Sequence, residues 1–388
     1  MSFEPMPARI DEEDELVCLG HGEENGGALT PPIFQSALFA QPSLGRLAAG
    51  LASEHDHRLY SRGNNPTVGA VEAKLARLER GEACRCLASG MAAVSAVLSS
   101  LLVAGDHVLV VNQVYGPTLE LLRRLERLGV RHDVTLELDP AAVAAALEKE
   151  TKLLWLESPG TMLFRTVDVA ALSALARARG IVTVLDNSWA TPLFQKPLTR
   201  GVDLVVHSAT KYLGGHSDVV AGAVVGSAAR LERLFHDALL LDGGVLSPFD
   251  AWLLNRGLRT LPVRMRRHHE SGLAVARFLA AHPRVRRVFH PALEAAAPGS
   301  LTGFSGLLSF DLGTASWDDL ARFVDRLRRF RIGVSWGGVE SLVLTPNRGG
   351  NAAALAAQGI PPALVRLSVG LEPPDVLIAD LEQALSEP

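Results

Sequence analysis

Short apolar runs alternate with amphipathic segments through the middle of the chain. The runs rich in β-branched residues predict strands at 108–111, 153–156, 181–185, 204–206 and 219–225. Ala- and Leu-rich helical patterns lie between them, at 119–128, 141–148 and 169–179. Gly129 and Gly180 follow two of these patterns, as is typical of residues that end helices. The repetition of strand and helix predicts an α/β fold with a mostly parallel, doubly wound sheet.

The two ends of the chain follow other patterns. Residues 1–60 show little periodicity and many turn formers, which predicts an extended arm. Residues 61–256 hold the alternating pattern and form the first expected domain. Residues 257–388 begin with long arginine-rich helical patterns and predict a smaller C-terminal α+β domain. Its further strand candidates are 306–312, 333–335 and 364–369.

Charge and length narrow the function classes. The chain has 388 residues, with 38 Lys plus Arg against 42 Asp plus Glu and a formal net charge of -4. The chain as a whole has no excess of positive charge that would attract nucleic acid, so we do not expect a nucleic-acid partner. The local basic run at 264–269 is interpreted as a solvated helix face or a strip that contacts another subunit.

Cysteine usage and apolar runs indicate a compartment. The three cysteines, Cys18, Cys84 and Cys86, form no CxxC pair, which argues against a disulfide framework and a structural metal site. Residues 1–15 are acidic and do not resemble a targeting peptide. The longest apolar runs are too short to span a bilayer. We therefore expect a cytoplasmic protein without membrane partners.

Polar residues follow the expected strands. Asn112, Glu157, Asp186 and Lys211 all lie just beyond an apolar run. In open parallel sheets, ligands bind beyond the carboxyl ends of strands. The chain has neither a GxGxxG loop after a strand nor a GxxxxGK[ST] loop, so dinucleotide and nucleoside triphosphate sites are disfavoured. An acid, a lysine and a phosphate loop are instead the parts that pyridoxal 5'-phosphate (PLP) needs.

Two motifs carry a resemblance to a known family. DNSWATP at 186–192 and SATKYLGGHSD at 208–218 resemble the signature of the Cys/Met-metabolism PLP-dependent enzymes, the trans-sulfuration family of methionine biosynthesis and related amino-acid metabolism. The likeness extends from about residue 30 to residue 381. It implies the aspartate aminotransferase-like fold (PLP fold type I), with residues 61–256 as the PLP-binding domain. It also implies a carbon–sulfur lyase or a related transferase that acts on a small amino acid.

The resemblance implies roles for the cofactor residues. Lys211 is expected to hold PLP as an imine and to act as general acid and base, and Asp186 to bond the pyridine nitrogen. The ASGMAA segment at 88–93 resembles the phosphate loop, with the amides of Gly90 and Met91 meeting the phosphate at a helix N-terminus. Ser208 and Thr210 are expected beside them. A lone lysine or aspartate is more often a surface residue, and small residues before a helix often serve packing alone.

Further site residues come from the same resemblance. Tyr115 is expected to stack on the cofactor ring, and Tyr60 and Arg62 to reach the phosphate in the neighbouring subunit. Tyr115 and Tyr60 join Lys211 as expected catalytic residues. Residues 1–60 then contribute to a neighbouring subunit, which requires at least a dimer, and family members are typically homotetramers. A buried tyrosine and a surface arginine are the alternatives.

The substrate end of the site is expected near the carboxyl terminus. Arg366 matches the arginine that binds the substrate α-carboxylate, with Ser335 and Trp336 beside it. A structural salt bridge for Arg366 and a turn-forming role for Ser335 are the alternatives. No metal site is expected.

The segment GVSWGG at 333–338 resembles the GxSWGG segment of bacterial cystathionine β-lyases, whereas γ-synthases and γ-lyases usually have SLGG there, often after an acidic residue. Val334 supplies no such acid, but it departs from the β-lyases, which often have an aromatic residue at this position. The expected reaction is α,β-elimination of L-cystathionine to homocysteine, pyruvate and ammonia. γ-Replacement or γ-elimination is the alternative, and a non-catalytic PLP-binding regulatory protein is a remote one. The unusual loop 163–166 beside the family pattern leaves substrate preference open.

Overall fold

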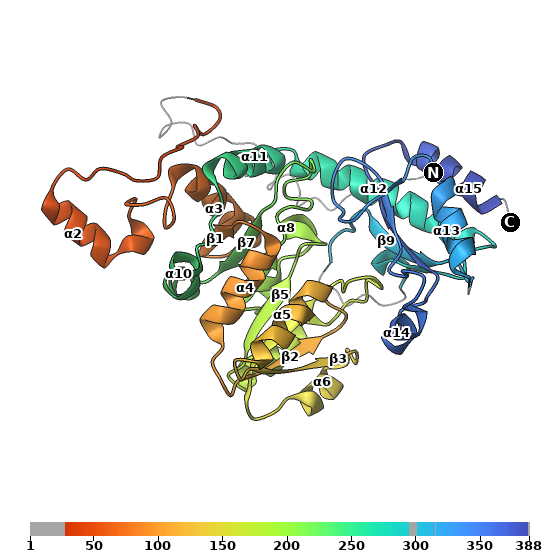
Figure 1. The fold of residues 1–388 in the computed structure, drawn as a ribbon, viewed down its shortest axis with the longest axis horizontal. Coiled ribbons are helices and arrows are strands. Elements are labelled where there is room, and N and C mark those ends of the chain that lie inside the picture. Colours follow the sequence, from red (N-terminus) through yellow and green to blue (C-terminus); the bar gives the residue numbers. More distant parts are fainter. Residues whose placement is uncertain (1–27, 295–300, 315, 387–388) are drawn as a thin grey trace.

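Two β-sheets, each covered by helices, organise the chain (Figure 1). The structure is a computed structural model that describes residues 28–294, 301–314 and 316–386. The larger sheet is built from residues in the first two thirds of the chain and the smaller one from the last third.

The larger sheet has seven strands in the order β1-β7-β6-β5-β4-β2-β3. β2 pairs in parallel with β3 and β4, and β5 pairs in parallel with β4 and β6. β7 pairs antiparallel with both β1 and β6. The prediction of an α/β, mostly parallel sheet is therefore confirmed. Its strands are β1 (Ala83–Leu87), β2 (His107–Val111), β3 (Arg131–Thr135), β4 (Thr151–Glu157), β5 (Val182–Asp186), β6 (Leu204–His207) and β7 (Gly222–Gly226).

The alternation of side chains along β2 explains why both faces of this sheet are covered. Val108 and Val110 pack in a cluster with the helix α4, whereas Leu109 and Val111 pack in a separate cluster with α6 and α7. Successive side chains of a strand point to opposite faces, so an uninterrupted apolar run requires a helix layer on each side. β2 is buried at every position.

Helices around the large sheet begin at polar caps. Ser89, Asp139, Asp168 and Ser247 each accept a backbone N–H of the helix that follows, which replaces a missing intrahelical partner. The helical elements of this region are α3 (Pro66–Glu79), α4 (Gly90–Leu101), α5 (Gly116–Glu126), α6 (Pro140–Ala146), α7 (Val169–Ala178), α8 (Thr191–Phe194), η2 (Pro197–Arg200), α9 (Ala228–Leu234), the π-helical turn η3 (Phe235–Leu239), α10 (Leu240–Asp242) and α11 (Pro248–Leu258).

The smaller sheet has five strands in the order β10-β11-β12-β9-β8. Its apolar face packs with the long helix α12 and the C-terminal helices in a cluster of its own. The elements are α12 (Leu261–Ala281), β8 (Arg287–Phe289), η4 (Pro291–Leu293), β9 (Leu307–Asp311), α13 (Trp317–Arg326), β10 (Arg331–Ile332), β11 (Leu342–Leu344), α14 (Ala352–Ala357), β12 (Leu364–Ser368) and α15 (Pro374–Ser386).

Two strand predictions need correction. The strand expected at 333–335 is wrong, since the strand β10 ends at Ile332 and Ser335 has a φ of 78°, in the left-handed region that strands do not use. The strand expected from Val219 begins only at Gly222, because residues 219–221 still belong to the loop that carries Lys211. β1 and β3 escaped prediction because their alternating or polar sequences carry no apolar run.

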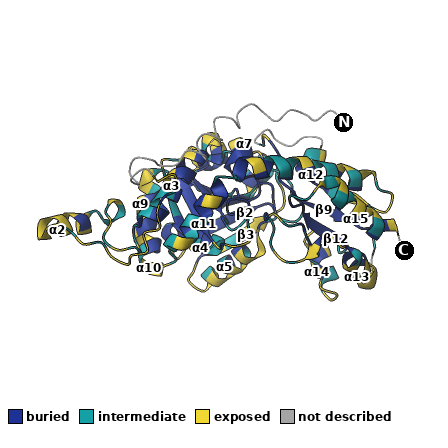
Figure 2. Cartoon of the chain, turned by 90° about the horizontal axis from the view of Figure 1, so that it is seen from above, coloured by how far each residue is buried: buried dark blue, intermediate teal, exposed yellow. Residues whose placement is uncertain are grey.

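The arm leaves the body of the molecule. Figures 1 and 2 show the helix α2 (Leu44–Ala52) projecting away from both sheets, with η1 (Glu54–Asp56) following it. A single antiparallel bridge between Leu38 and Tyr60 closes the base of this projection. Exposed apolar side chains remain along the arm, including Leu44 and Leu51. Residues 1–27 of the expected arm lie outside the described residues, and the division of the chain at residues 60 and 256 stays a prediction.

The basic run at 264–269 is not a solvated helix face throughout. Arg264 is buried, and its guanidinium donates to the carbonyls of Tyr212 and Gly257, both at 2.7 Å. Tyr212 directly follows Lys211, so Arg264 holds the backbone of the lysine loop. The sequence could not reveal this because a buried and an exposed arginine look alike in a charge pattern.

Cys84 and Cys86 are buried free thiols in β1, and Cys18 lies outside the described residues. A search of the described helices found none with the length and apolar character needed to cross a bilayer.

Replacing a core leucine tests the two-faced packing of β2. Leu109→Ala, at a site 1% exposed, should lower the free energy of unfolding by about 2–5 kcal/mol, because it leaves a cavity between sheet and helices. Leu128→Ala, at 67% exposure, is the matched control and should change it by less than about 0.5 kcal/mol. Urea unfolding followed by circular dichroism measures both; equal losses would contradict the assignment of layers.

Candidate active site

One cavity of about 610 Å³ collects most of the expected site residues. It lies at the carboxyl ends of β2, β4, β5 and β6 and is closed by segments that flank β11 and β12 of the smaller sheet. Convergence of strand ends from a parallel sheet places side chains from distant parts of the sequence together. The expected residues that line it are Gly90, Met91, Tyr115, Asp186, Ser208, Thr210, Lys211, Ser335, Trp336 and Arg366.

Lys211 projects from the loop between β6 and β7. Its Nζ donates to the Ser335 hydroxyl at 2.5 Å and lies 5.5 Å from the centre of the Trp336 ring. Desolvation and, to a smaller extent, the nearby positive charge of Arg366 lower the pKa of the Lys211 amine to about 8, against the opposing effect of Asp186. The amine therefore loses its proton and becomes nucleophilic near neutral pH far more readily than an ordinary lysine.

Gly337 brings the SWGG segment against the lysine loop. Its φ is 88°, and a Cβ there would lie 2.8 Å from the Tyr212 nitrogen and 3.0 Å from the Lys211 carbonyl carbon. Such contacts leave no room for a side chain, so glycine is required for this close approach. The segment that carries Ser335 and Trp336 is thus held directly over Lys211.

Asp186 ends β5 and lines the cavity. One of its carboxylate oxygens accepts the Ser188 N–H at 2.9 Å. Desolvation raises the pKa of the Asp186 carboxyl above its ordinary value, while the Ser188 hydrogen bonds and the charges of His207 and Lys211 act in the other direction. Within the described ranges no salt bridge neutralises this carboxylate. A protonated ring nitrogen would supply the cation that this half-buried acid lacks.

The N-terminus of α4 leaves two backbone amides without a partner in the helix. The Ser89 hydroxyl accepts the Ala92 N–H at 3.0 Å and the Ser89 carbonyl accepts the Ala93 N–H, which leaves the amides of Gly90 and Met91 as the free donors of the first turn. A Cβ on Gly90 would lie 2.8 Å from the Ser208 side chain. Glycine therefore lets the helix end approach Ser208, and free amides at a helix N-terminus suit a phosphate.

The two hydroxyls of the lysine loop differ in availability. The Thr210 Oγ1 donates to the Ala221 carbonyl at 3.1 Å and accepts the Ala221 N–H at 3.0 Å, so it ties together the two ends of the loop. The Ser208 N–H donates to the Ser188 hydroxyl at 2.7 Å. Thr210 thus has a structural role in addition to lining the cavity, which the sequence did not indicate.

Arg366 lies on β12 with only 8% of its surface exposed. One terminal nitrogen donates to the Ser335 carbonyl at 3.0 Å. Desolvation lowers the pKa of the guanidinium to about 10, which still leaves it cationic at neutral pH. No carboxylate of the described chain forms a salt bridge with it, so the structural salt bridge considered from sequence is not found there. A planar, buried and unneutralised guanidinium suits a substrate carboxylate.

Glu157 is a functional neighbour absent from the expected site list. One of its oxygens accepts the Tyr115 N–H at 2.8 Å, which holds the start of the Tyr115 loop against β4. Desolvation, together with the negative charge of Asp186, raises the pKa of the Glu157 carboxyl well above its ordinary value. Its place directly after an apolar run was the signal for it. Tyr115 itself lines the cavity and is 50% exposed.

Tyr60 and Arg62 do not join this cavity. They lie at the base of the arm, with the Arg62 guanidinium 5.5 Å from the centre of the Tyr60 ring. Tyr60 is 47% exposed. The chain therefore does not bring these two residues to its own site.

Other lining residues also escaped prediction. Phe164 has a φ of 50° and Met162 a φ of 65°, so the loop after β4 turns back into the cavity. Sequence patterns carry little signal for such irregular backbone. The additional lining residues are Ser89, Thr161, Met162, Phe164, Ser188, Trp189, Val334 and Arg348, among others.

The residues present fit PLP. The cavity offers an amine of lowered pKa, a half-buried acid without a salt bridge among the described residues, and free amides at a helix N-terminus. These match the aldehyde, the ring nitrogen and the phosphate of that cofactor.

Comparisons with known proteins agree with this chemistry. The sequence model of the Cys/Met metabolism PLP-dependent enzymes matches residues 15–386. The chain is 41% identical to the L-methionine gamma-lyase of Pseudomonas putida, over 95% of this chain and 96% of that protein. It is 39% identical to the cystathionine gamma-lyase of Bacillus subtilis, with 94% and 96% covered, and 38% identical to the cystathionine beta-lyase of Lactococcus lactis subsp. cremoris, with 93% and 95% covered.

A solved structure is also similar. The crystal structure of cystathionine gamma synthase from Xanthomonas oryzae pv. oryzae in complex with aminoacrylate and cysteine has a TM-score of 0.89 and 36% identity. The match covers 96% of this chain and 97% of that one. The fold expected from the sequence is therefore the fold of this relative.

The lowered pKa of Lys211 predicts how cofactor capture depends on pH. The free amine is the reactive form, so the rate at which cofactor-free protein captures PLP should rise with pH with a midpoint near pH 8. Arg366→Gln removes a positive charge that lowers this pKa, so the midpoint should move to higher pH. Stopped-flow absorbance of the bound cofactor measures both. A midpoint that is unchanged, or that moves down, would contradict the charge coupling.

Proposed function

The chain belongs to the Cys/Met metabolism PLP-dependent enzyme family, and on this premise we propose that it cleaves the carbon–sulfur bond of L-cystathionine by α,β-elimination. The products are homocysteine, pyruvate and ammonia. The observation that carries the proposal is one cavity in which the amine of Lys211 lies among Asp186, Ser335 and Arg366. An amine of lowered pKa beside a carboxylate-binding guanidinium suits proton removal from an amino acid.

The residues divide the work as follows. PLP, when bound, supplies an electron sink for charge that develops at the substrate Cα. Asp186 would hold its ring nitrogen, and the amides of Gly90 and Met91 its phosphate. Lys211 would anchor it and, once displaced by the substrate amine, take the Cα proton and later return a proton.

Arg366 and Ser335 orient the substrate. The Arg366 guanidinium binds the α-carboxylate, and its hydrogen bond to the Ser335 carbonyl at 3.0 Å fixes the direction of the guanidinium plane. Fixing the carboxylate decides which bond to Cα is broken. The Ser335 hydroxyl accepts a hydrogen bond from the Lys211 amine. It can continue to accept hydrogen bonds from this amine when the lysine moves. Tyr115 covers the cavity from the opposite loop.

The preference for β-elimination rests on the SWGG segment. Val334 lines the cavity, is 78% exposed and offers no charge. The acids among the described lining residues are Glu157 and Asp186, at the ends of β4 and β5, so no acid stands at the Val334 side. Trp336 supplies an aromatic wall beside Lys211. These features support the resemblance to β-lyases noted for the sequence.

A γ-reaction is the second candidate. The relatives named gamma-lyase and gamma-synthase support it, since they are similar to this chain at 36–41% identity. A single lysine can in principle serve both reactions, because γ-chemistry also begins with loss of the Cα proton. A non-catalytic PLP-binding role is disfavoured by the intact set of Lys211, Asp186 and Arg366 in one cavity.

The keto acid released from L-cystathionine separates the two reactions. We expect purified, PLP-loaded protein to release pyruvate with homocysteine, and Lys211→Ala to lose activity by at least about 10³-fold, because it lacks both anchor and base. Chromatography of the derivatised keto acids measures the products. Release of 2-oxobutyrate alone would refute β-elimination and support the γ-candidate.

We further propose that the active site is shared between subunits of a homotetramer built from dimers. Tyr60 and Arg62 lie outside their own cavity, on an arm that leaves exposed apolar side chains such as Leu44 and Leu51. An apolar arm projecting into water is stable when another surface covers it. A neighbouring subunit would bring Arg62 to the phosphate of the opposite cavity.

Mixed subunits test the shared site. Arg62→Ala and Lys211→Ala should each be nearly inactive alone, but a mixed dimer contains one site with both residues intact. Co-refolding the two variants should therefore restore up to about a quarter of the wild-type activity per subunit, the share expected when random pairing makes half the dimers mixed and each holds one intact site. Light scattering with the same samples reports assembly; mixed dimers without activity would contradict the proposal.

We place the protein in the cytoplasm on the chemistry of its cysteines. Cys84 and Cys86 are separated by a single residue in the sequence, and both are free thiols. Free thiols persist in reducing compartments.

A further inference from the structure

Resting on the proposed function, we propose that Arg348 binds a second carboxylate of the substrate, at the end remote from the α-carboxylate held by Arg366. The site then selects sulfur amino acids that carry two carboxylates over those with an uncharged alkyl group on sulfur. Arg348 is a specificity-determining residue in this account, and it takes no part in proton transfer.

The two arginines come from β12 and from the loop that follows its neighbour β11. Leu344, the last residue of β11, is the Cα partner of Arg366 on β12, and both line the cavity. Arg348 follows Leu344 by four residues and lines the same cavity from the loop. Arg366 is buried and Arg348 is exposed, so the cavity has one arginine in its interior and another where it meets solvent.

Two asparagines hold the loop that carries Arg348. The buried Asn347 donates to the Pro362 carbonyl at 2.9 Å and accepts the Gly349 N–H at 2.9 Å. Asn351 accepts the Arg348 N–H at 2.8 Å and donates to the Pro346 carbonyl at 3.1 Å. Asparagine side chains that bond nearby backbone groups stabilise a defined turn. The backbone at Arg348 is thus fixed on both sides, which lowers the entropy lost when a ligand binds.

The charge of Arg348 is not neutralised by the described part of the chain. No carboxylate there lies within salt-bridge distance, 4.0 Å, of its guanidinium, and the described acids of the cavity, Glu157 and Asp186, are at the strand ends of the large sheet. Arg366 and Lys211 add further positive charge. The entrance therefore attracts anions.

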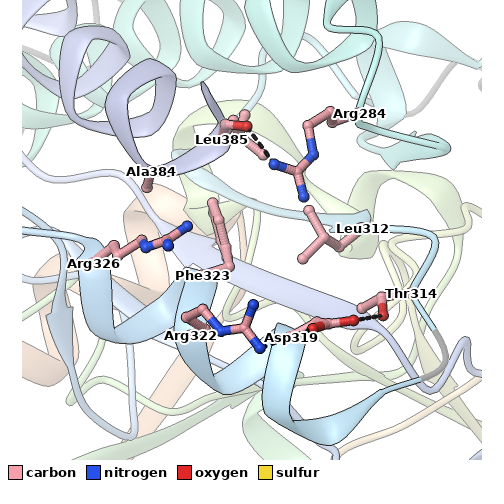
Figure 3. Close-up of a pocket in the computed structure, with 9 residues that line it drawn as sticks. All are labelled: Arg284, Leu312, Thr314, Asp319, Arg322, Phe323, Arg326, Ala384 and Leu385. Carbon is pink, nitrogen blue, oxygen red and sulfur yellow. Dashed lines mark hydrogen bonds and ion pairs between the residues drawn. The ribbon is translucent and has the colours of Figure 1, made fainter. Parts of the chain in front are cut away.

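A second pocket shows the contrasting case. Figure 3 shows Arg284, Arg322 and Arg326 around a cavity of about 70 Å³ in the C-terminal domain. There the chain supplies its own partners: Arg322 pairs with Asp319 at 3.2 Å, and Arg284 donates to the Leu385 carbonyl at 2.8 Å. Arg322 and Arg284 thus have partners within the chain, whereas Arg348 lines the active-site cavity without a carboxylate partner among the described residues.

The cavity that both arginines line also suits a thioether chain. Val334 and Trp336 line it as well and present apolar groups, against which methylenes and sulfur pack well. A dicarboxylic substrate such as L-cystathionine would place one carboxylate at each guanidinium and its thioether over this surface. An alkyl substrate would gain nothing from Arg348.

Paired substrates test the proposal on PLP-loaded enzyme. L-Cystathionine carries the second carboxylate, and S-ethyl-L-cysteine has the same thioether without it. In Arg348→Gln the KM for L-cystathionine should rise about five- to tenfold with kcat little changed, as expected for loss of one charge-assisted contact at an exposed site. The KM for S-ethyl-L-cysteine should stay within about twofold. Arg348→Lys, which keeps the charge, should lie between.

Controls separate this proposal from the proposed function. Arg329→Gln removes an exposed arginine of the same domain, outside the cavity, and should leave both substrates unaffected. Calorimetric binding of both substrates to Lys211→Ala with PLP, with and without Arg348→Gln, needs no turnover, so it decides the role of Arg348 even if wild type cleaves neither. Equal losses for both substrates, or no loss for L-cystathionine, would overturn the inference.

Discussion

The site depends on the placement of one amine in surroundings that disfavour its charge. Desolvation and the positive charge of Arg366 lower the pKa of Lys211, and the negative charge of Asp186 offsets only part of this effect. Lys211 lies in the loop after β6, Asp186 ends β5, and Arg366 lies on β12 of the smaller sheet. The lowered pKa of Lys211 therefore depends on both sheets being folded and packed together. The packing of two separate cores is therefore a condition for the reactivity of a single side chain.

The fold supports that balance with contacts made by backbone groups. Arg264, buried in α12, bonds the carbonyl of Tyr212, and Gly337 presses the SWGG segment against the same stretch. The Ser335 carbonyl in turn orients Arg366. Each contact links the last third of the chain to residues at the cavity: Arg264 and Gly337 to the lysine loop, and Ser335 to Arg366. Residues that never touch a substrate thus set the position of those that do.

Much of this was predictable from the sequence, and the exceptions have physical reasons. The buried parallel strands were found within one or two residues because their apolar runs are continuous, and the polar residues that follow them, Asp186 and Lys211, were placed correctly in one cavity. β3 was missed because it is largely exposed and polar, and the strand at 333–335 was wrong because Ser335 adopts a left-handed conformation that no pattern encodes. Long-range pairings such as Arg264 with Tyr212 likewise have no local signal.

The tie between Thr210 and Ala221 has a consequence for how the enzyme tolerates sequence change. The antiparallel strands β6 and β7 start and finish the lysine loop side by side, and Thr210 bonds both backbone groups of Ala221. Residues 210–221 thus form a loop that is closed at its base by these hydrogen bonds, next to the ends of β6 and β7. Insertions in other loops leave this closed loop intact. One extra residue between Thr210 and Ala221 would instead shift Lys211 away from its position in the cavity. Sequence changes that alter substrate preference are therefore better tolerated in the loops at the rim of the cavity than in the loop that carries Lys211.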